Sequence, residues 1–189
     1  MSLDVWTVID TYFRDTPYYK SQHQIESYNE FLSSNINGFQ HIIKRENPSK
    51  IFKDNYEINI YFGETLDKDG KIKKEENIFI SKPIIKNKES YMYPNEARLR
   101  NLTYKSEIYI NIGIEYINND NNEKIIENFN KINIGSIPIM VHSKLCILNG
   151  LDAIKLSEMG ECPYDQGGYF IIKGKEKVIL SQENKVNNI

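Results

Sequence analysis

The sequence predicts an α+β fold in which N-terminal helices precede a largely antiparallel sheet that ends in a C-terminal β-hairpin. Apolar residues recur at helical spacing within residues 1–48, and the pattern changes to alternation within residues 55–189. Near the end of the chain, a Gly-Lys pair separates two β-favouring runs, which is typical of a tight hairpin. A length of 189 residues suits one domain of ordinary size, so we expect residues 1–189 to form a single domain.

Three helices are expected in the first part of the chain. Asp4 can cap the first helix, which ends before Pro17, and the second helix runs from about Gln22. Asn35 offers a cap for the third helix, which ends before Pro48. The apolar residues at helical spacing are Val5, Ile9 and Phe13, then Ile25, Tyr28 and Leu32, then Ile36, Phe39 and Ile43.

Strands are expected from residue 55 onward, where apolar and polar residues alternate. The 67–70 segment, Asp-Lys-Asp-Gly, indicates a turn between two strands, and the polar 118–123 segment indicates another connection. The apolar residues that mark these strands are Tyr56, Ile58, Ile60 and Phe62, then Ile78, Ile80, Ile84 and Ile85, then Ile108, Ile110, Ile112 and Ile114.

The C-terminal hairpin is predicted in most detail. Gly174-Lys175 fits a two-residue type II′ loop, because glycine stands where a positive φ is needed. A loop at this place would pair Lys173 with Glu176 and Ile171 with Val178.

Composition limits the classes of function. The formal net charge is −2, with 24 Lys and Arg residues against 26 Asp and Glu residues. A free-standing nucleic-acid binder usually carries a basic excess, so any contact with DNA must come from a local basic face. The two cysteines, Cys146 and Cys162, support neither a disulfide framework nor a zinc ribbon. Neither a signal peptide nor a membrane span is indicated, so we expect no membrane partner.

Several motifs that could carry chemistry fit structural roles better. The 168–175 segment ends in Gly-Lys, but five residues separate its glycines and Glu176 follows the lysine, which does not match a phosphate-binding loop. His142 and Cys146 lie four residues apart, but a metal site needs three or four converging ligands. Asp67 and Asp69 fit ordinary turn chemistry. We therefore assign no catalytic residue, metal site or cofactor to this chain.

Two groups of basic residues are candidates for contact with nucleic acid. Arg98 and Arg100 could bind phosphate, but Pro94 and Glu96 also fit a short helix with an i, i+4 ion pair between Glu96 and Arg100.

The second group lies at the predicted hairpin tip and consists of Lys173, Lys175 and Lys177. Such a tip could contact a nucleic-acid backbone or an acidic protein factor. A solvated turn is the alternative, because Glu176 partly neutralises the cluster.

Four blocks of sequence carry a family resemblance. They read QHQIESYNEFL at 22–32, YPNEARLRNLTY at 93–104, IPIMVHSK at 137–144 and GECPYDQGGYFIIKGKEKVI at 160–179. In this order they resemble the N-terminal part of the second-largest (β-like) subunit of DNA-directed RNA polymerases, of the RNA polymerase II type and its large-DNA-virus relatives. The four blocks span nearly the whole chain.

The resemblance implies a non-catalytic role in a transcribing enzyme. It corresponds to the element called the protrusion, which forms a wall of the DNA cleft and helps to seat transcription initiation factors. The implied partners are the largest subunit, the remainder of the second-largest subunit and the DNA template. Nucleotidyl transfer would use Mg²⁺ held by the largest subunit, because no block here resembles its metal-binding motif. The opening residues look more like viral relatives, which implies a virion or infected-cell cytoplasm; a cellular version would be nuclear.

The resemblance covers an incomplete protrusion, because in the family the chain leaves for a lobe domain and returns later. The sequence is therefore expected to be either a fragment of a longer subunit or the product of a split gene. In the second case it would be a separately encoded scaffold module that docks on the other polymerase subunits. In both cases, the absence of the returning strands should leave apolar surface uncovered.

Overall fold

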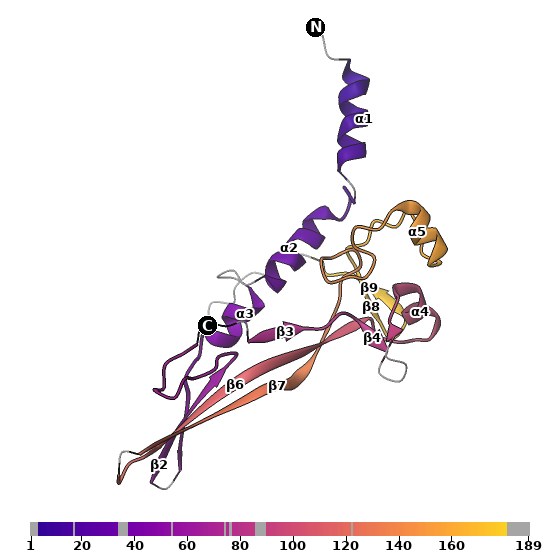
Figure 1. Cartoon of the computed structure of the whole chain (residues 1–189). Coiled ribbons are helices and arrows are strands. Elements are labelled where there is room, and N and C mark those ends of the chain that lie inside the picture. Colours follow the sequence, from indigo (N-terminus) through magenta and orange to yellow (C-terminus); the bar gives the residue numbers. More distant parts are fainter. Residues whose placement is uncertain are drawn as a thin grey trace, which may run out of the picture. The chain divides into compact units, whose positions relative to one another are not determined.

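A computed structural model shows the α+β fold that the sequence predicts, with helices, a mostly antiparallel sheet and a C-terminal hairpin (Figure 1). It describes residues 4–16, 18–33, 38–53, 55–73, 75, 77–85, 90–121 and 123–180. The helices are α1 (Val5–Asp15), α2 (Gln22–Leu32), α3 (Phe39–Lys44), α4 (Pro94–Leu99) and α5 (Ala153–Glu158). The strands are β1 (Ser49–Lys53), β2 (Tyr56–Phe62), β3 (Ile78–Ile80), β4 (Ile84–Ile85), β5 (Ser90–Tyr91), β6 (Lys105–Asn118), β7 (Lys124–Pro138), β8 (Phe170–Ile172) and β9 (Lys175–Lys177).

The chain forms two compact units, each built from separate stretches of sequence. Unit 1 consists of Met1–Ile25, Met92–Tyr104 and Pro138–Ile189, and unit 2 consists of Glu26–Tyr91 and Lys105–Ile137. The division into one helical part and one β part of a single domain stays a prediction. No helix in the described ranges has the length and apolar character needed to cross a lipid bilayer.

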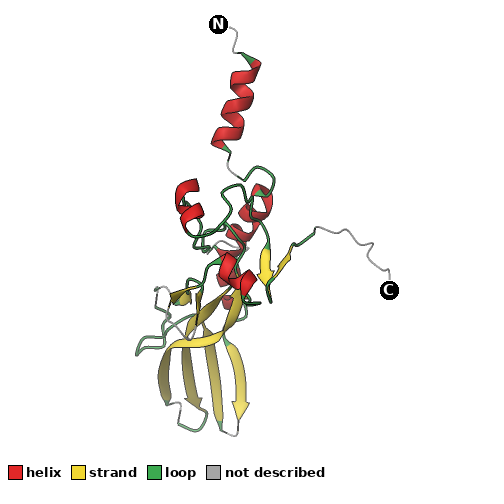
Figure 2. Ribbon diagram, turned by 90° about the vertical axis from the view of Figure 1, so that its right-hand side faces the viewer, coloured by secondary structure: helices red, strands yellow, loops and turns green. Residues whose placement is uncertain are grey.

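Unit 2 is organised by the long strand β6. The antiparallel strands β2 and β3 pair with its two halves, β7 also pairs with it, and β1 extends the sheet beyond β2. Figure 2 shows this sheet as the group of long yellow strands. Alternation along β6 buries Ile108 and Ile110, which pack with Ile78 of β3 in the core. Phe39 and Ile43 of α3 pack against the same cluster, so one face of the sheet is covered by a helix.

Unit 2 also buries a carboxylate on the sheet. Glu115 is 6% exposed and accepts hydrogen bonds from Asn59 Nδ2 at 3.2 Å and Lys124 Nζ at 2.9 Å. Burial alone would raise the pKa of Glu115, but these two donors stabilise the charged form and lower the pKa below its ordinary value. The ion pair joins β6 to β7 through side chains.

Unit 1 is held together by backbone hydrogen bonds among three distant segments. Tyr104 N donates to Ile171 O, Ile139 N donates to Tyr104 O, and Val141 N donates to Tyr169 O, each at 2.9 Å. The Tyr104 side chain is fully buried among these segments, where its hydroxyl lies 3.4 Å from Cys146 Sγ. The segments that carry the 93–104, 137–144 and 160–179 blocks are therefore neighbours.

The local signals for the first helices are largely confirmed. Asp4 is the N-cap of α1 and accepts a hydrogen bond from Trp6 N, and α2 begins at Gln22 as expected. Pro17, Asn35 and Ile36 lie outside the described residues. The described part of the third helix begins at Phe39, after Gly38.

Three elements were missed by the sequence reasoning, namely β1, the two-residue strand β5 and α5. In β1, Ile51 and Phe52 are adjacent and all five residues are exposed, so no alternation marks the strand. The six-residue α5 buries only Leu156, which gives no helical repeat to detect. Short elements with at most one buried residue leave no periodic signal in the sequence.

The predicted register of the C-terminal hairpin is wrong. Ile172 pairs with Lys175 and Phe170 with Lys177, so the loop is Lys173-Gly174 and not Gly174-Lys175. Both loop residues have positive φ, 50° and 74°, as a type I′ turn requires. Contacts with a distant segment favour this loop: Gly174 N donates to the backbone Leu102 O at 2.9 Å, and Lys173 N donates to the side-chain Thr103 Oγ1 at 3.1 Å.

Candidate functional site

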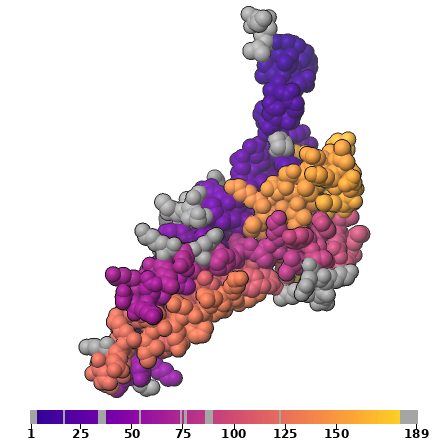
Figure 3. Space-filling model, viewed as in Figure 1, coloured from indigo at the N-terminus to yellow at the C-terminus, as the bar shows by residue number. Residues whose placement is uncertain are grey.

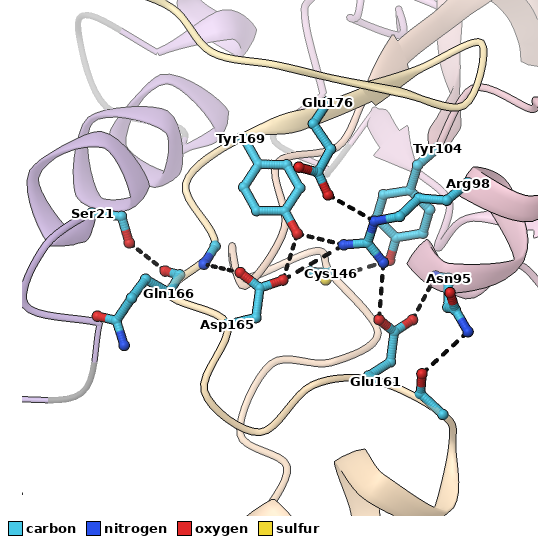
Figure 4. Close-up of polar contacts among 12 residues, drawn as sticks. Ser21, Asn95, Arg98, Tyr104, Cys146, Glu161, Asp165, Gln166, Tyr169 and Glu176 are labelled. Atoms are coloured by element: carbon cyan, nitrogen blue, oxygen red, sulfur yellow. Dashed lines mark hydrogen bonds and ion pairs between the residues drawn. The ribbon is translucent and has the colours of Figure 1, made fainter.

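Arg98, at the end of α4, lies at the centre of a cluster of acidic side chains in unit 1 (Figure 4). Its Nη1 lies 3.2 Å from Glu161 Oε2, its Nη2 3.5 Å from Asp165 Oδ2, and its Nε 2.9 Å from Glu176 Oε1. The Tyr169 hydroxyl accepts a hydrogen bond from Arg98 and donates one to Asp165. One guanidinium thus joins α4, the 161–165 loop and the C-terminal hairpin, as only the planar fork of arginine can.

Two carboxylates of this cluster, which is called the Arg98 cluster below, also accept hydrogen bonds from backbone amides. Glu161 has a side chain that is only 3% exposed, and its Oε1 accepts a hydrogen bond of 2.6 Å from Asn95 N at the start of α4. Asp165 Oδ1 accepts from Gly167 N at 2.9 Å. The cluster therefore acts as a structural joint between the 93–104 and 160–179 blocks.

The cluster also shifts the pKa values of its members. Burial alone would lower the pKa of Arg98, but Tyr169 and the hydrogen bonds to Glu176 and Glu161 outweigh it and raise this pKa. Burial raises the pKa of Tyr169, and its hydrogen bond to the Asp165 carboxylate raises it further. The arginine stays charged and the phenol stays neutral throughout the physiological range.

The cluster lines an open pocket of about 430 Å³. The lining residues are Asn95, Arg98, Gly160, Glu161, Cys162, Tyr164, Asp165, Tyr169 and Glu176. In the described ranges, no group of three or more His, Cys, Asp or Glu side chains is placed to hold a metal ion. Cys146 is buried, and burial raises the pKa of its thiol, which disfavours the nucleophilic thiolate.

Lys173, Lys175 and Lys177 lie together on the exposed hairpin of β8 and β9 and are called the lysine hairpin below. Residues 175 and 177 share one face of β9, whereas Glu176 faces the other side and pairs with Arg98. Glu176 shares the guanidinium of Arg98 with Glu161 and Asp165, so partial neutralisation of the lysines by Glu176 stays a prediction. The hairpin presents a local positive surface on a chain of net charge −2.

The structure places the predicted basic residues in three different settings. Arg98 is three-quarters buried and paired with acids of its own unit. Arg100 forms the expected i, i+4 ion pair with Glu96, at 2.6 Å. The lysine hairpin is exposed. Contact of any of these five residues with nucleic acid or with a factor stays a prediction.

Sequence reasoning missed the acidic partners of Arg98. Glu161, Asp165 and Glu176 lie 63 to 78 residues after Arg98, so no local spacing connects them to it. The signal available was their position: Arg98 lies in one of the four sequence blocks and all three acids lie in another. Residues in separate blocks of one resemblance are candidates for contact with one another.

Comparison with known proteins finds relatives along nearly the whole chain. Residues 19–187 match the family model described as RNA polymerase beta subunit. The chain is 36% identical to DNA-directed RNA polymerase II subunit RPB2 of Schizosaccharomyces pombe, over 98% of this chain and 16% of that protein. It is 34% identical to DNA-directed RNA polymerase subunit Rpo2N of Methanothermobacter thermautotrophicus, over 100% of this chain and 32% of that protein.

A shorter match is to a subunit of RNA polymerase III. DNA-directed RNA polymerase III subunit 2 of Arabidopsis thaliana is 44% identical over 95 residues, which is 50% of this chain and 8% of that protein. The chain thus spans less than a third of the length of each of these curated relatives. Because the family model covers nearly all of it, the chain belongs to the RNA polymerase beta subunit family and corresponds to the N-terminal part of the second-largest subunit.

Proposed function

We propose that this chain is the protrusion part of the second-largest subunit in a DNA-dependent RNA polymerase, where it forms one wall of the DNA cleft. Its family membership supports the proposal, since the chain is similar over almost its whole length to subunits named for this enzyme. The structural support for the proposal is the Arg98 cluster. This cluster joins the 93–104 and 160–179 blocks into one packed body that has a basic hairpin at its edge.

In this proposal the contribution of the chain to nucleotidyl transfer is positional. The Mg²⁺ ions would be held by the largest subunit, and this chain would hold DNA and initiation factors in place. A cellular version would work in the nucleus, and a viral version in the virion or the infected-cell cytoplasm. Affinity purification of the tagged chain from its source tests the proposal. We expect the largest polymerase subunit and DNA-templated RNA synthesis in the eluate, and the absence of both would reject it.

The exposed apolar surface of α1 favours assembly with other polymerase subunits. This helix has no buried residue, and Trp6, Val5 and Phe13 are 71%, 68% and 51% exposed. The helix lies in the indigo part of the surface drawn in Figure 3. Such a surface on an amphipathic helix is typical of an interaction site. We expect the chain expressed alone to aggregate, and co-expression with its partner subunits to restore solubility, as measured by size-exclusion chromatography. A soluble monomer that unfolds in one sharp transition would contradict this expectation.

The lysine hairpin is the proposed contact with the DNA backbone. Replacing Lys173, Lys175 and Lys177 together with Gln should weaken DNA binding by the assembled polymerase. The slope of log K against log salt should become less steep by about one for each phosphate that the variant no longer neutralises. Fluorescence anisotropy over a series of salt concentrations measures this slope.

Lys155→Gln, which removes an exposed lysine of α5, is the control and should leave the salt slope unchanged. An unchanged slope in the triple variant would show that the hairpin does not contact DNA. If binding of an initiation factor were abolished instead, the lysine hairpin would be a site for an acidic factor.

A further inference from the structure

His142 is a buried histidine that the proposed function does not use. It is 3% exposed, and its ring stacks on that of Tyr18 with 4.3 Å between the centroids and 27° between the planes. On another side, Gly167 packs so closely that a Cβ atom there would lie 2.7 Å from His142 Cδ2. The imidazole is therefore enclosed between the 18–21 turn and the 166–168 loop, both of which belong to unit 1.

The surroundings of His142 suit only an uncharged ring. Neither Nδ1 nor Nε2 has a hydrogen-bond partner within the described ranges. Burial lowers the pKa of His142 below its ordinary value of 6.5, and the charge of Asp165 only partly opposes this effect. An imidazolium would need to satisfy two N–H donors and a full charge in a place that provides for neither.

The other titratable groups around this site compensate the positive charge only in part. Burial raises the pKa of the Tyr18 hydroxyl and that of the Cys146 thiol, so both groups are neutral at neutral pH. The Asp165 carboxylate already accepts from Gly167 N and Tyr169 and lies 3.5 Å from Arg98 Nη2. Its charge is therefore shared with a permanent cation.

The 166–168 loop also anchors the start of α2. Ser21 immediately precedes α2, its hydroxyl donates a hydrogen bond to Gln166 O, and its amide donates to Tyr18 O at 2.9 Å. Gly168 fits against Ser21 so closely that a Cβ atom there would lie 2.6 Å from Ser21 Cβ. The ring stack and this hydroxyl contact together hold the 18–21 turn on the 166–168 loop.

We propose that His142 is a proton-sensitive latch, which holds the 18–21 turn against the 166–168 loop at neutral pH and releases it on acidification. A buried base with a lowered pKa favours the closed form above pH 6.5. Closure weakens as the pH falls below 6.5, because the open form then binds a proton that the closed form does not. Opening should become up to about tenfold more frequent per pH unit in this window, since one proton is coupled to it.

Hydrogen exchange of the tagged chain, purified with the subunits that accompany it, tests the latch between pH 7.0 and 5.5. After correction for intrinsic exchange rates, amides of the 18–25 and 166–168 segments should exchange faster toward pH 5.5. His142→Phe keeps an aromatic ring for Tyr18 but cannot bind a proton, so it should abolish this pH dependence. His41→Phe, which replaces an exposed histidine of α3, should leave it intact.

Two results would overturn the latch: no pH dependence in the parent chain, or the same dependence in His142→Phe. If His142→Phe does not assemble, the ring of His142 is titrated directly by NMR in the parent chain with labelled histidine. A pKa below 6.5 for this ring would support the latch, and a pKa of 6.5 or above would reject it.

Discussion

Replacing Arg98 with methionine is expected to destabilise unit 1 by about 3 kcal/mol. Methionine has a similar length but no charge, so Glu161, with its side chain 3% exposed, would keep a buried charge without its cation. Removing one member of a buried ion pair typically costs about 3–5 kcal/mol, and the partial exposure of Arg98 places the value at the lower end. Native-state hydrogen exchange at Tyr104 and Val141, in the chain assembled with its partners, measures the destabilisation.

Arg100→Met is the matched control for this experiment. Arg100 is two residues away and its 2.6 Å ion pair with Glu96 lies on the surface, so removing it should cost about 0.5 kcal/mol or less. Arg98→Lys should fall between the two, because lysine restores the charge but cannot reach three acids with one planar group. Equal effects of Arg98→Met and Arg100→Met would mean that the Arg98 cluster is not a structural joint.

Gly167→Ala should destabilise unit 1 by about 2–4 kcal/mol. Gly167 has a φ of 62°, and a Cβ atom there would lie 2.7 Å from both Val141 O and His142 Cδ2. The left-handed conformation costs alanine about 1–2 kcal/mol, and overpacking against backbone adds about 1–3 kcal/mol. The expected readout is faster hydrogen exchange at Val141 and Gly168, whose amides hold the loop.

Gly150→Ala separates the two causes of this destabilisation. Gly150 has a φ of 74° but no atom within 4 Å of the added Cβ, so only the conformational cost of about 1 kcal/mol should remain. If both substitutions cost the same amount, close packing of the 166–168 loop against the 141–142 segment does not contribute to stability.

The sequence revealed those features whose causes are local. The Asp4 cap, the start of α2 at Gln22, and the ion pair between Glu96 and Arg100 all depend on residues within one or two helical turns. The same is true of the alternation along β6. Local spacing is enough to predict each of these features.

The features that sequence could not supply depend on distant contacts. Both Lys173-Gly174 and Gly174-Lys175 are acceptable hairpin loops, and only the hydrogen bonds from the loop to Leu102 and Thr103 select the first. In the same way, the three acids from the 161–176 region that surround Arg98 could not be predicted from its local sequence. A basic residue is free to bind a ligand only if the fold does not already pair it.

The alternation of the chain between its two units has a consequence for synthesis on the ribosome. All residues of unit 2 have been translated once residue 137 is added, whereas unit 1 needs the 138–189 stretch as well. Its N-terminal segment therefore cannot form the contact between Ser21 and Gln166 until more than a hundred further residues have been translated. Closing so long a loop carries an entropic cost that grows only slowly with length, so the delay is set by translation and not by the chain search. During that interval the nascent N-terminal segment lacks its packing partners in unit 1, so we expect chaperones to bind this segment.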